Sequence, residues 1–127
     1  MGKPILLDTD VMVDFLRGHA RAVAFVKAHS ERIILSSIVI AELYAGVMED
    51  QEQAILDELV KIFRVVPVTV ELAKAAGIHK RDFGKSHGVG LADAILAATA
   101  QSEGAELKTL NVKHYPMMRG LKAPYEK

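Results

Sequence analysis

The sequence predicts an α/β fold: a three-layer α/β/α arrangement with a short, mainly parallel central sheet. Two observations predict it. Short apolar runs of strand length occur at residues 5–7, 33–35 and 65–68, and the segment 106–110 is expected to form a fourth strand. Longer amphipathic or alanine-rich stretches separate them, and strands that alternate with helices usually pair in parallel with helices on both faces. A length of 127 residues suits one domain, which we expect to span residues 1–127.

The first connection between strands is expected to contain two helices. Thr9 or Asp10 can cap a helix that stops at Gly18, because short polar side chains satisfy free N–H groups at a helix start. A second helix is expected over about residues 20–29. It leads into the second strand.

Ser36 and Ser37 follow the second strand and can cap a helix from residue 38 to about 48. The polar residues 49–52 then break the apolar pattern. Apolar residues recur after them at helical spacing, which predicts a long amphipathic helix with one buried face. That face carries Ile55, Leu56, Leu59, Ile62 and Phe63.

The second half of the chain repeats the alternation of strand and helix. Its capping signal is Thr69, which follows the third strand and precedes Glu71, an acid that favours the first turn of a helix. The elements are expected in this order: a helix from Thr69 to near Gly84, a loop over 85–90, a helix over 91–102, the strand at 106–110 and a last short strand around Leu121.

The composition excludes several classes of protein. There are no cysteines, which excludes a disulfide framework and a cysteine zinc site and fits a cytoplasmic location. No apolar run reaches the ~18 residues that span a membrane. The net charge is zero, but residues 1–78 carry 8 basic and 11 acidic side chains, whereas residues 79–127 carry 8 and 5. A basic side facing an acidic cleft would suit a polyanion, although an ordinary solvated surface explains the asymmetry equally well.

Three carboxylates stand in otherwise apolar segments. Asp8 ends the first strand, Glu42 is the only charged residue between positions 32 and 49, and Asp93 is the only Asp, Glu, Lys or Arg between positions 85 and 103. Acids are almost never fully buried unless something pairs with them, and no Lys or Arg lies close in sequence. We therefore expect the three acids to meet in one cleft and share a cation.

The predicted topology explains why the acids should converge. In open parallel sheets, ligands bind beyond the carboxyl ends of the strands. Asp8 and Asn111 follow strands directly, whereas Glu42 and Asp93 lie in helices that start near the same edge. Oxygen ligands without cysteine or a paired histidine motif favour a hard ion such as Mg²⁺ or Mn²⁺.

Each acid also has a simpler explanation. Asp8 could be only a helix cap, Glu42 could extend into solvent, and Asp93 could be a favourable acid in a first helical turn. The functional hypothesis depends on all three lying at equivalent ends of separate elements. Asp10 could tune the site from beside Asp8, and Asp14, one helical turn later, is expected to be exposed.

Four blocks of sequence resemble the successive motifs of PIN domains, in order and over almost the whole chain. They are LLDTDV at 6–11, SSIVIAEL at 36–43, LADAILAATA at 91–100 and LKTLN at 107–111. The resemblance is strongest to the VapC toxins of toxin–antitoxin pairs. It implies a PIN-like domain, a Mg²⁺- or Mn²⁺-dependent endoribonuclease, metal ligation by Asp8, Glu42 and Asp93, a homodimer, and a cognate antitoxin whose tail covers the active site.

Two positions depart from the family pattern. Asp10 replaces the Asn that often follows the Asp-Thr pair, which adds charge to the cleft. The fourth acid is missing, because Asn111 matches an alternative found in the family and His114 stands where Asp is frequent. A second metal site is therefore in question. Thr109 and Asn111 could still bind a metal-bound water or an acid through hydrogen bonds.

The substrate of such an enzyme would be an RNA phosphodiester. Contacts to phosphates supply affinity with little sequence information, and we expect them from Lys80, Arg81, Lys85, Lys108, Lys113 and Arg119. Two alternatives stay open at this point. Asp8-Thr9-Asp10 after a strand also suits a haloacid-dehalogenase-type phosphatase, and a weakly active PIN-like binding module in a repressor complex is the second.

Overall fold

Four short strands form one parallel sheet in the computed structural model, which describes residues 2–126 except for the side chain of His87. The strands are β1 (Ile5–Leu7), β2 (Ile33–Ser36), β3 (Arg64–Val66) and β4 (Glu106–Lys108). They lie in the order β3-β2-β1-β4, and all three pairings are parallel. β1 is central: Leu6 lies opposite Ile34 on one side and Leu107 on the other.

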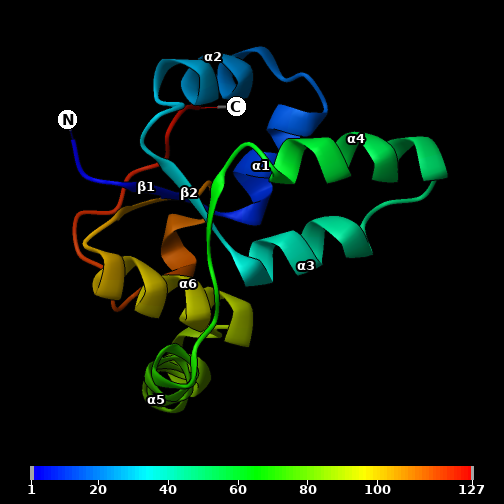
Figure 1. Cartoon of the computed structure of the whole chain (residues 1–127). Helices are drawn as coiled ribbons and strands as arrows, with labels where there is room; N and C mark the ends of the chain where they lie inside the picture. The colour runs from blue at the N-terminus through cyan, green and yellow to red at the C-terminus, as the bar shows by residue number, and fades with distance from the viewer. Residues whose placement is uncertain (1, 127) are drawn as a thin grey trace.

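Helices cover both faces of this sheet, which confirms the predicted three-layer arrangement (Figure 1). One layer contains α5 packed on α6, and in the other α1 packs against α2 and α3, with α4 next to α3. No helix within residues 2–126 combines the length and the apolar character needed to cross a membrane. The helices are α1 (Thr9–Leu16), α2 (Ala20–Ala28), α3 (Ser37–Ala45), α4 (Asp50–Val60), α5 (Val70–His87), α6 (Leu91–Glu103) and the short 3₁₀ helix η1 (Val112–His114).

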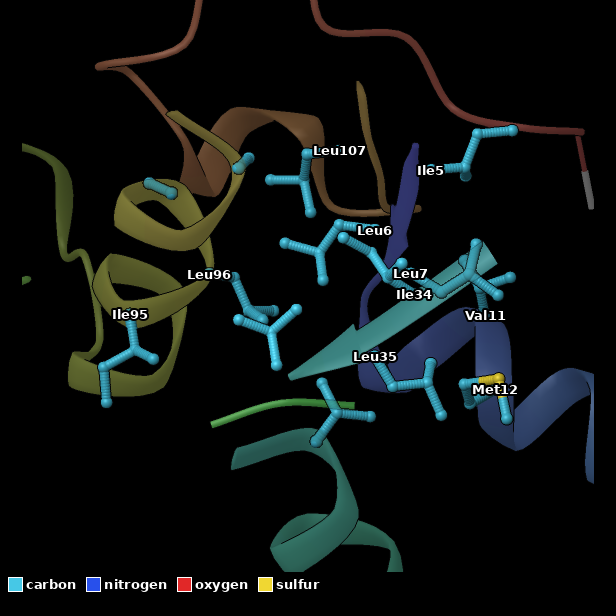
Figure 2. Packing of buried hydrophobic residues seen from close by; sticks show 14 of the residues in the cluster. Ile5, Leu6, Leu7, Val11, Met12, Ile34, Leu35, Ile95, Leu96 and Leu107 are labelled. Atoms are coloured by element: carbon cyan, nitrogen blue, oxygen red, sulfur yellow. The ribbon is translucent and has the colours of Figure 1, made fainter. Parts of the chain in front are cut away.

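The core lies on both sides of the two central strands. Figure 2 shows strand side chains such as Leu6 and Leu35 between Leu96 of α6 and Val11 and Met12 of α1. All five side chains are fully buried. A short strand that is buried on both faces is mainly apolar, which is why the central strands β1 and β2 were recognisable as continuous apolar runs rather than alternating ones.

Several predicted boundaries were wrong. α5 continues through the predicted loop as far as residue 87, and Gly88 ends it in the left-handed conformation at φ 65°. β4 stops at Lys108, because the chain beyond it turns toward Asp10 through side-chain hydrogen bonds. No strand forms around Leu121 in the described part of the chain. The small and polar residues after Gly84 suggested a loop, but residues 85–87 form the last turn of α5.

The predicted buried face of α4 was also partly wrong. Leu56 is buried, but Ile55 is 59% exposed and Ile62 is 74% exposed. The helix starts earlier than expected, at Asp50, and ends at Val60, so Ile62 does not lie on its face. Periodicity marks apolar positions, but it does not reveal where a helix ends or how much of its apolar stripe a neighbour covers.

The strand order creates a topological switch point beside β1. The chain moves from β1 to β2 and then β3 on one side, and β4 pairs with the other side of β1. The amide N of Asp8 donates to the carbonyl O of Lys108 at 3.0 Å, so the two strands stay paired at their carboxyl ends. Ligands bind at such switch points in open α/β sheets, so a ligand site is expected at the residues just after β1 and β4.

Candidate active site

Asp8 lies at the switch point and accepts hydrogen bonds through both carboxylate oxygens. It is 7% exposed and is the N-cap of α1, with Oδ1 accepting from the amide of Thr9 at 2.7 Å. Its Oδ2 accepts from the hydroxyls of Thr109 and Tyr115, each at 2.8 Å. The prediction that Thr9 or Asp10 caps α1 was wrong. Asp8 caps the helix and also binds two side chains from the far end of the chain.

Asp93 lies in the first turn of α6 and is linked to Asp8 by one side chain. The Tyr115 hydroxyl that contacts Asp8 is 3.1 Å from Oδ1 of Asp93, and Oδ2 of Asp93 is 3.6 Å from Nδ1 of His114. Partial burial raises the pKa of the Asp93 carboxyl, and the negative charge of Asp8 raises it further. The tyrosine hydroxyl and His114 oppose that shift. The two acids therefore interact electrostatically, as their expected convergence requires.

Glu42 is less enclosed than its apolar sequence context suggested. It is exposed on α3, so the premise that it is a costly buried acid was wrong. Its Oε1 accepts a hydrogen bond from the Thr9 hydroxyl at 2.5 Å, which connects it to the start of α1 next to Asp8. It also lines a cavity of about 500 Å³ among α1, α3 and α4. A residue whose sequence neighbours are all apolar can still lie on the face of a helix that meets solvent.

Asp10 and Asn111 are joined by a hydrogen bond between their side chains. Oδ1 of Asp10 accepts from the amide of Val11 at 2.7 Å, and its Oδ2 accepts from the amide of Leu110 at 2.9 Å and from Nδ2 of Asn111 at 3.1 Å. Burial raises the pKa of Asp10 to about 6, and the charge of Asp8 contributes. This pair fastens the segment after β4 to the start of α1.

The donor set fits a hard divalent cation in its chemistry. Asp8, Asp93 and Glu42 offer carboxylate oxygens, the ligands that Mg²⁺ and Mn²⁺ prefer. Across residues 2–126, however, no group of three or more His, Cys, Asp or Glu side chains is arranged to hold a metal ion. Asp8 and Asp93 share the Tyr115 hydroxyl, and Thr9 connects Asp8 to Glu42 through its amide and its hydroxyl. Joint ligation of one ion by the three acids stays a prediction.

Sequence reasoning missed Tyr115. Its ring is 1% exposed, and burial together with the charges of Asp8 and Asp93 raises the pKa of its hydroxyl. It follows η1, and no spacing or motif distinguishes a tyrosine there from a core aromatic residue. Only the fold brings it to acids that are 107 and 22 residues away.

The second acid of α1 was predicted wrongly. Asp14 is buried, not exposed, and its Oδ2 accepts from the hydroxyl of Tyr125 at 2.8 Å. His19 is half-buried and stacks on the Tyr125 ring with 5.4 Å between ring centroids. The end of the chain therefore packs on α1 and the start of α2, a long-range contact without a sequence signal.

The basic residues predicted to hold RNA differ in their surroundings. Nζ of Lys80 donates to the carbonyl O of Val89 at 2.7 Å, just before α6, and Arg81 pairs with Asp82 at 3.0 Å. Lys113 lies exposed in η1, next to the histidine that faces Asp93. Lys108 contacts Asp8 through its backbone carbonyl, and Lys113 is the sequence neighbour of His114, which faces Asp93.

Comparison with known proteins finds relatives that match almost the whole chain. The family model described as PIN domain matches residues 5–115. Ribonuclease VapC10 of Mycobacterium tuberculosis is 37% identical over 123 residues, covering 95% of this chain and 92% of that protein. Ribonuclease VapC19 of the same species is 37% identical over 124 residues, covering 94% and 98%. A solved toxin–antitoxin complex from Klebsiella pneumoniae superposes with a TM-score of 0.83 at 24% identity, covering 97% of this chain and 99% of that one, and shows the same fold.

Proposed function

The chain belongs to the PIN-domain family, and on that premise we propose that it is a ribonuclease, the toxin of a toxin–antitoxin pair. One observation carries this proposal: two proteins named ribonuclease VapC are 37% identical to it over nearly their whole length. The fold supports it, because the motif acids Asp8 and Asp93 lie together at the switch point of the sheet.

We assign metal binding to the acids of this edge. Asp8 and Asp93 are the direct ligands of Mg²⁺ or Mn²⁺, because one hydroxyl already holds their carboxylates together. Glu42 ligates the ion or orients the attacking water, since it is exposed and fixed by Thr9. A bound divalent ion supplies a more acidic water and offsets the charge that develops on a phosphate during hydrolysis. Asn111 acts indirectly, by holding Asp10.

Substrate binding in this proposal is mainly electrostatic. Exposed Lys113 lies beside His114, which faces Asp93, and so can hold an RNA phosphate near the acids. Lys80 serves the site differently: its bond to Val89 steadies the segment that leads into α6. Such contacts fix the position of an RNA chain without selecting its sequence.

The same proposal includes protein partners and a location. A cognate antitoxin is expected because the relatives are VapC proteins and solved neighbours are described as toxin–antitoxin complexes. A homodimer agrees with the large apolar side chains left exposed on α4, α5 and α6, among them Ile55, Val70 and Leu91. We take residues 1–127 as one domain that works in the cytoplasm.

The test is RNA cleavage by the purified chain, freed of any partner, with Mg²⁺ or Mn²⁺ and with EDTA. Asp93→Asn should lower the cleavage rate by more than a hundredfold, as loss of a metal ligand does. Glu106→Gln is the matched control, because Glu106 starts β4 at the opposite edge of the sheet and pairs with Arg32. Full cleavage by the Asp93→Asn variant, or cleavage that EDTA leaves untouched, would refute the metal-dependent mechanism.

The phosphatase alternative finds no support in these comparisons, because the matching family is that of PIN domains. The binding-module alternative is addressed by the same assay, since RNA binding without cleavage in any metal would favour it.

A further inference from the structure

One hydroxyl group lies between the two acids that are our proposed metal ligands. The Tyr115 oxygen is 2.8 Å from Oδ2 of Asp8 and 3.1 Å from Oδ1 of Asp93. A phenol has a single hydrogen to donate, so it cannot satisfy both carboxylates fully at once. A divalent ion could bind both oxygens together.

The hydroxyl also uses acceptor capacity that an ion would need. Oδ2 of Asp8 accepts from Thr109 as well as from Tyr115, each at 2.8 Å. A carboxylate oxygen has two lone pairs, so both are engaged. Oδ1 of the same side chain accepts from the amide of Thr9 at the helix cap. An ion held by Asp8 and Asp93 would therefore compete for their oxygens with the hydroxyl that contacts both acids, that of Tyr115.

Without an ion, the hydroxyl has a structural effect of its own. Two carboxylates at one site repel each other, and a hydrogen-bond donor between them reduces that repulsion. Tyr115 is well placed for this, because its ring is buried in the core and its amide is held by the carbonyl O of Val112 at 3.2 Å. The hydroxyl thus has a fixed position relative to both acids.

We propose that the Tyr115 hydroxyl is a stand-in for the cation: it holds Asp8 and Asp93 together in the metal-free protein and competes with a divalent ion for them. Tyr115 is then a positioning residue whose hydroxyl weakens metal binding while it orders the empty pair. This inference rests on the proposed function, specifically on metal ligation by Asp8 and Asp93.

The test compares two tyrosines that make equivalent bonds. Tyr115→Phe removes the hydroxyl at the site and keeps the ring. Tyr125→Phe removes a hydroxyl that donates to Asp14, also at 2.8 Å, away from the acid pair. Mn²⁺ is titrated into each full-length variant, and the free ion is followed by electron paramagnetic resonance. Tyr115→Phe should bind Mn²⁺ about fivefold more tightly than the unaltered protein, the order expected when one competing hydrogen bond is lost. Tyr125→Phe should bind it unchanged.

Thermal unfolding supplies a second readout that does not depend on cleavage. In EDTA both Phe variants should unfold at a lower temperature than the unaltered protein, because each has lost a hydrogen bond. At saturating Mn²⁺ the deficit of Tyr115→Phe should close, since the ion replaces the hydroxyl and tighter binding adds stability. The deficit of Tyr125→Phe should persist.

The outcomes separate this inference from the proposed function. Unchanged or weaker Mn²⁺ binding by Tyr115→Phe overturns the stand-in role, and a purely structural tyrosine would give that result. If Asp93→Asn then abolishes binding, the metal site itself stands. If no Mn²⁺ binds to the unaltered protein, both the metal site and the stand-in role are refuted.

Discussion

The hydroxyl of Thr9 donates a hydrogen bond to Oε1 of Glu42 at 2.5 Å. This bond joins the first residue of α1 to an exposed position of α3. The amide of the same residue donates to Asp8. Thr9 therefore fixes an exposed acid relative to a buried one. Asp8 and Glu42, which belong to separate elements, thus have a defined relation before any ligand binds.

Replacing this threonine tests whether Glu42 must be held in place. Thr9→Val keeps the shape of the side chain and loses the hydroxyl. We expect RNA cleavage to fall about tenfold, because a misplaced catalytic group slows a reaction without blocking it. Stability should change by less than about 1 kcal/mol, since the bond is exposed. The measurements are kcat/KM for RNA and urea unfolding.

Thr69→Val is the matched control for that experiment. Thr69 accepts a hydrogen bond from the amide of Leu72 as the cap of α5, so its loss should cost about 1 kcal/mol and leave cleavage intact. Equal activity of the Thr9→Val variant and the unaltered protein would show that Glu42 needs no tether.

A second prediction concerns pH. The pKa of Asp10 is raised from its usual 3.8 to about 6, first by burial and then by Asp8. Between these two values the folded protein binds a proton that the unfolded chain has released. The free energy of unfolding should therefore decrease as pH rises from about 4 to about 6 and then level off.

Asp10→Asn isolates this contribution, because it cannot titrate. Urea unfolding in EDTA at several pH values should show a difference between the two proteins that changes with pH only in this window. The amide also disturbs the bonds to Leu110 and Asn111, so a constant offset is expected as well. A difference that is independent of pH would contradict the raised pKa.

The central strands β1 and β2 were predictable because all their residues are buried and almost all are apolar, and acids stand out in such apolar segments. Asp8 and Asp93 were found as isolated charges in apolar segments, and the structure links them. The same reasoning failed for Glu42, because an apolar neighbourhood in sequence does not reveal which face of a helix meets solvent.

The remaining features depend on contacts between distant parts of the chain. Tyr115 meets Asp8 across 107 positions, and Tyr125 meets Asp14 across 111. Neither tyrosine differs locally from a residue that merely fills the core. Such contacts follow from the path of the chain after β4, which local periodicity does not determine.

A third prediction concerns RNA binding. Lys113 is exposed in η1, beside the histidine that faces Asp93. Lys113→Ala should raise KM for RNA severalfold with little change in kcat, and it should reduce the dependence of binding on salt by about one phosphate contact. Lys27→Ala, an exposed charge on α2, is the control. An identical salt dependence in the two variants would exclude Lys113 from the RNA contact.

The last prediction concerns how the end of the chain is held. Tyr125 donates to buried Asp14 and stacks on His19, and the nearby Arg21 binds the carbonyl O of Glu126 at 2.5 Å. Asp14→Ala leaves the tyrosine hydroxyl without this acceptor and should lower the free energy of unfolding by about 1–3 kcal/mol, whereas Tyr125→Phe should cost about 0.5–1.5 kcal/mol.

The double variant distinguishes a shared bond from two separate effects. If the two side chains stabilise the fold through each other, Asp14→Ala combined with Tyr125→Phe should cost less than both single losses added together. Urea unfolding of the four proteins measures this. RNA cleavage at a temperature where all four remain folded should be nearly equal, because neither residue touches Asp8 or Asp93 through a hydrogen bond that the structure describes. Strict additivity of the two losses would mean that the tail is held by other contacts.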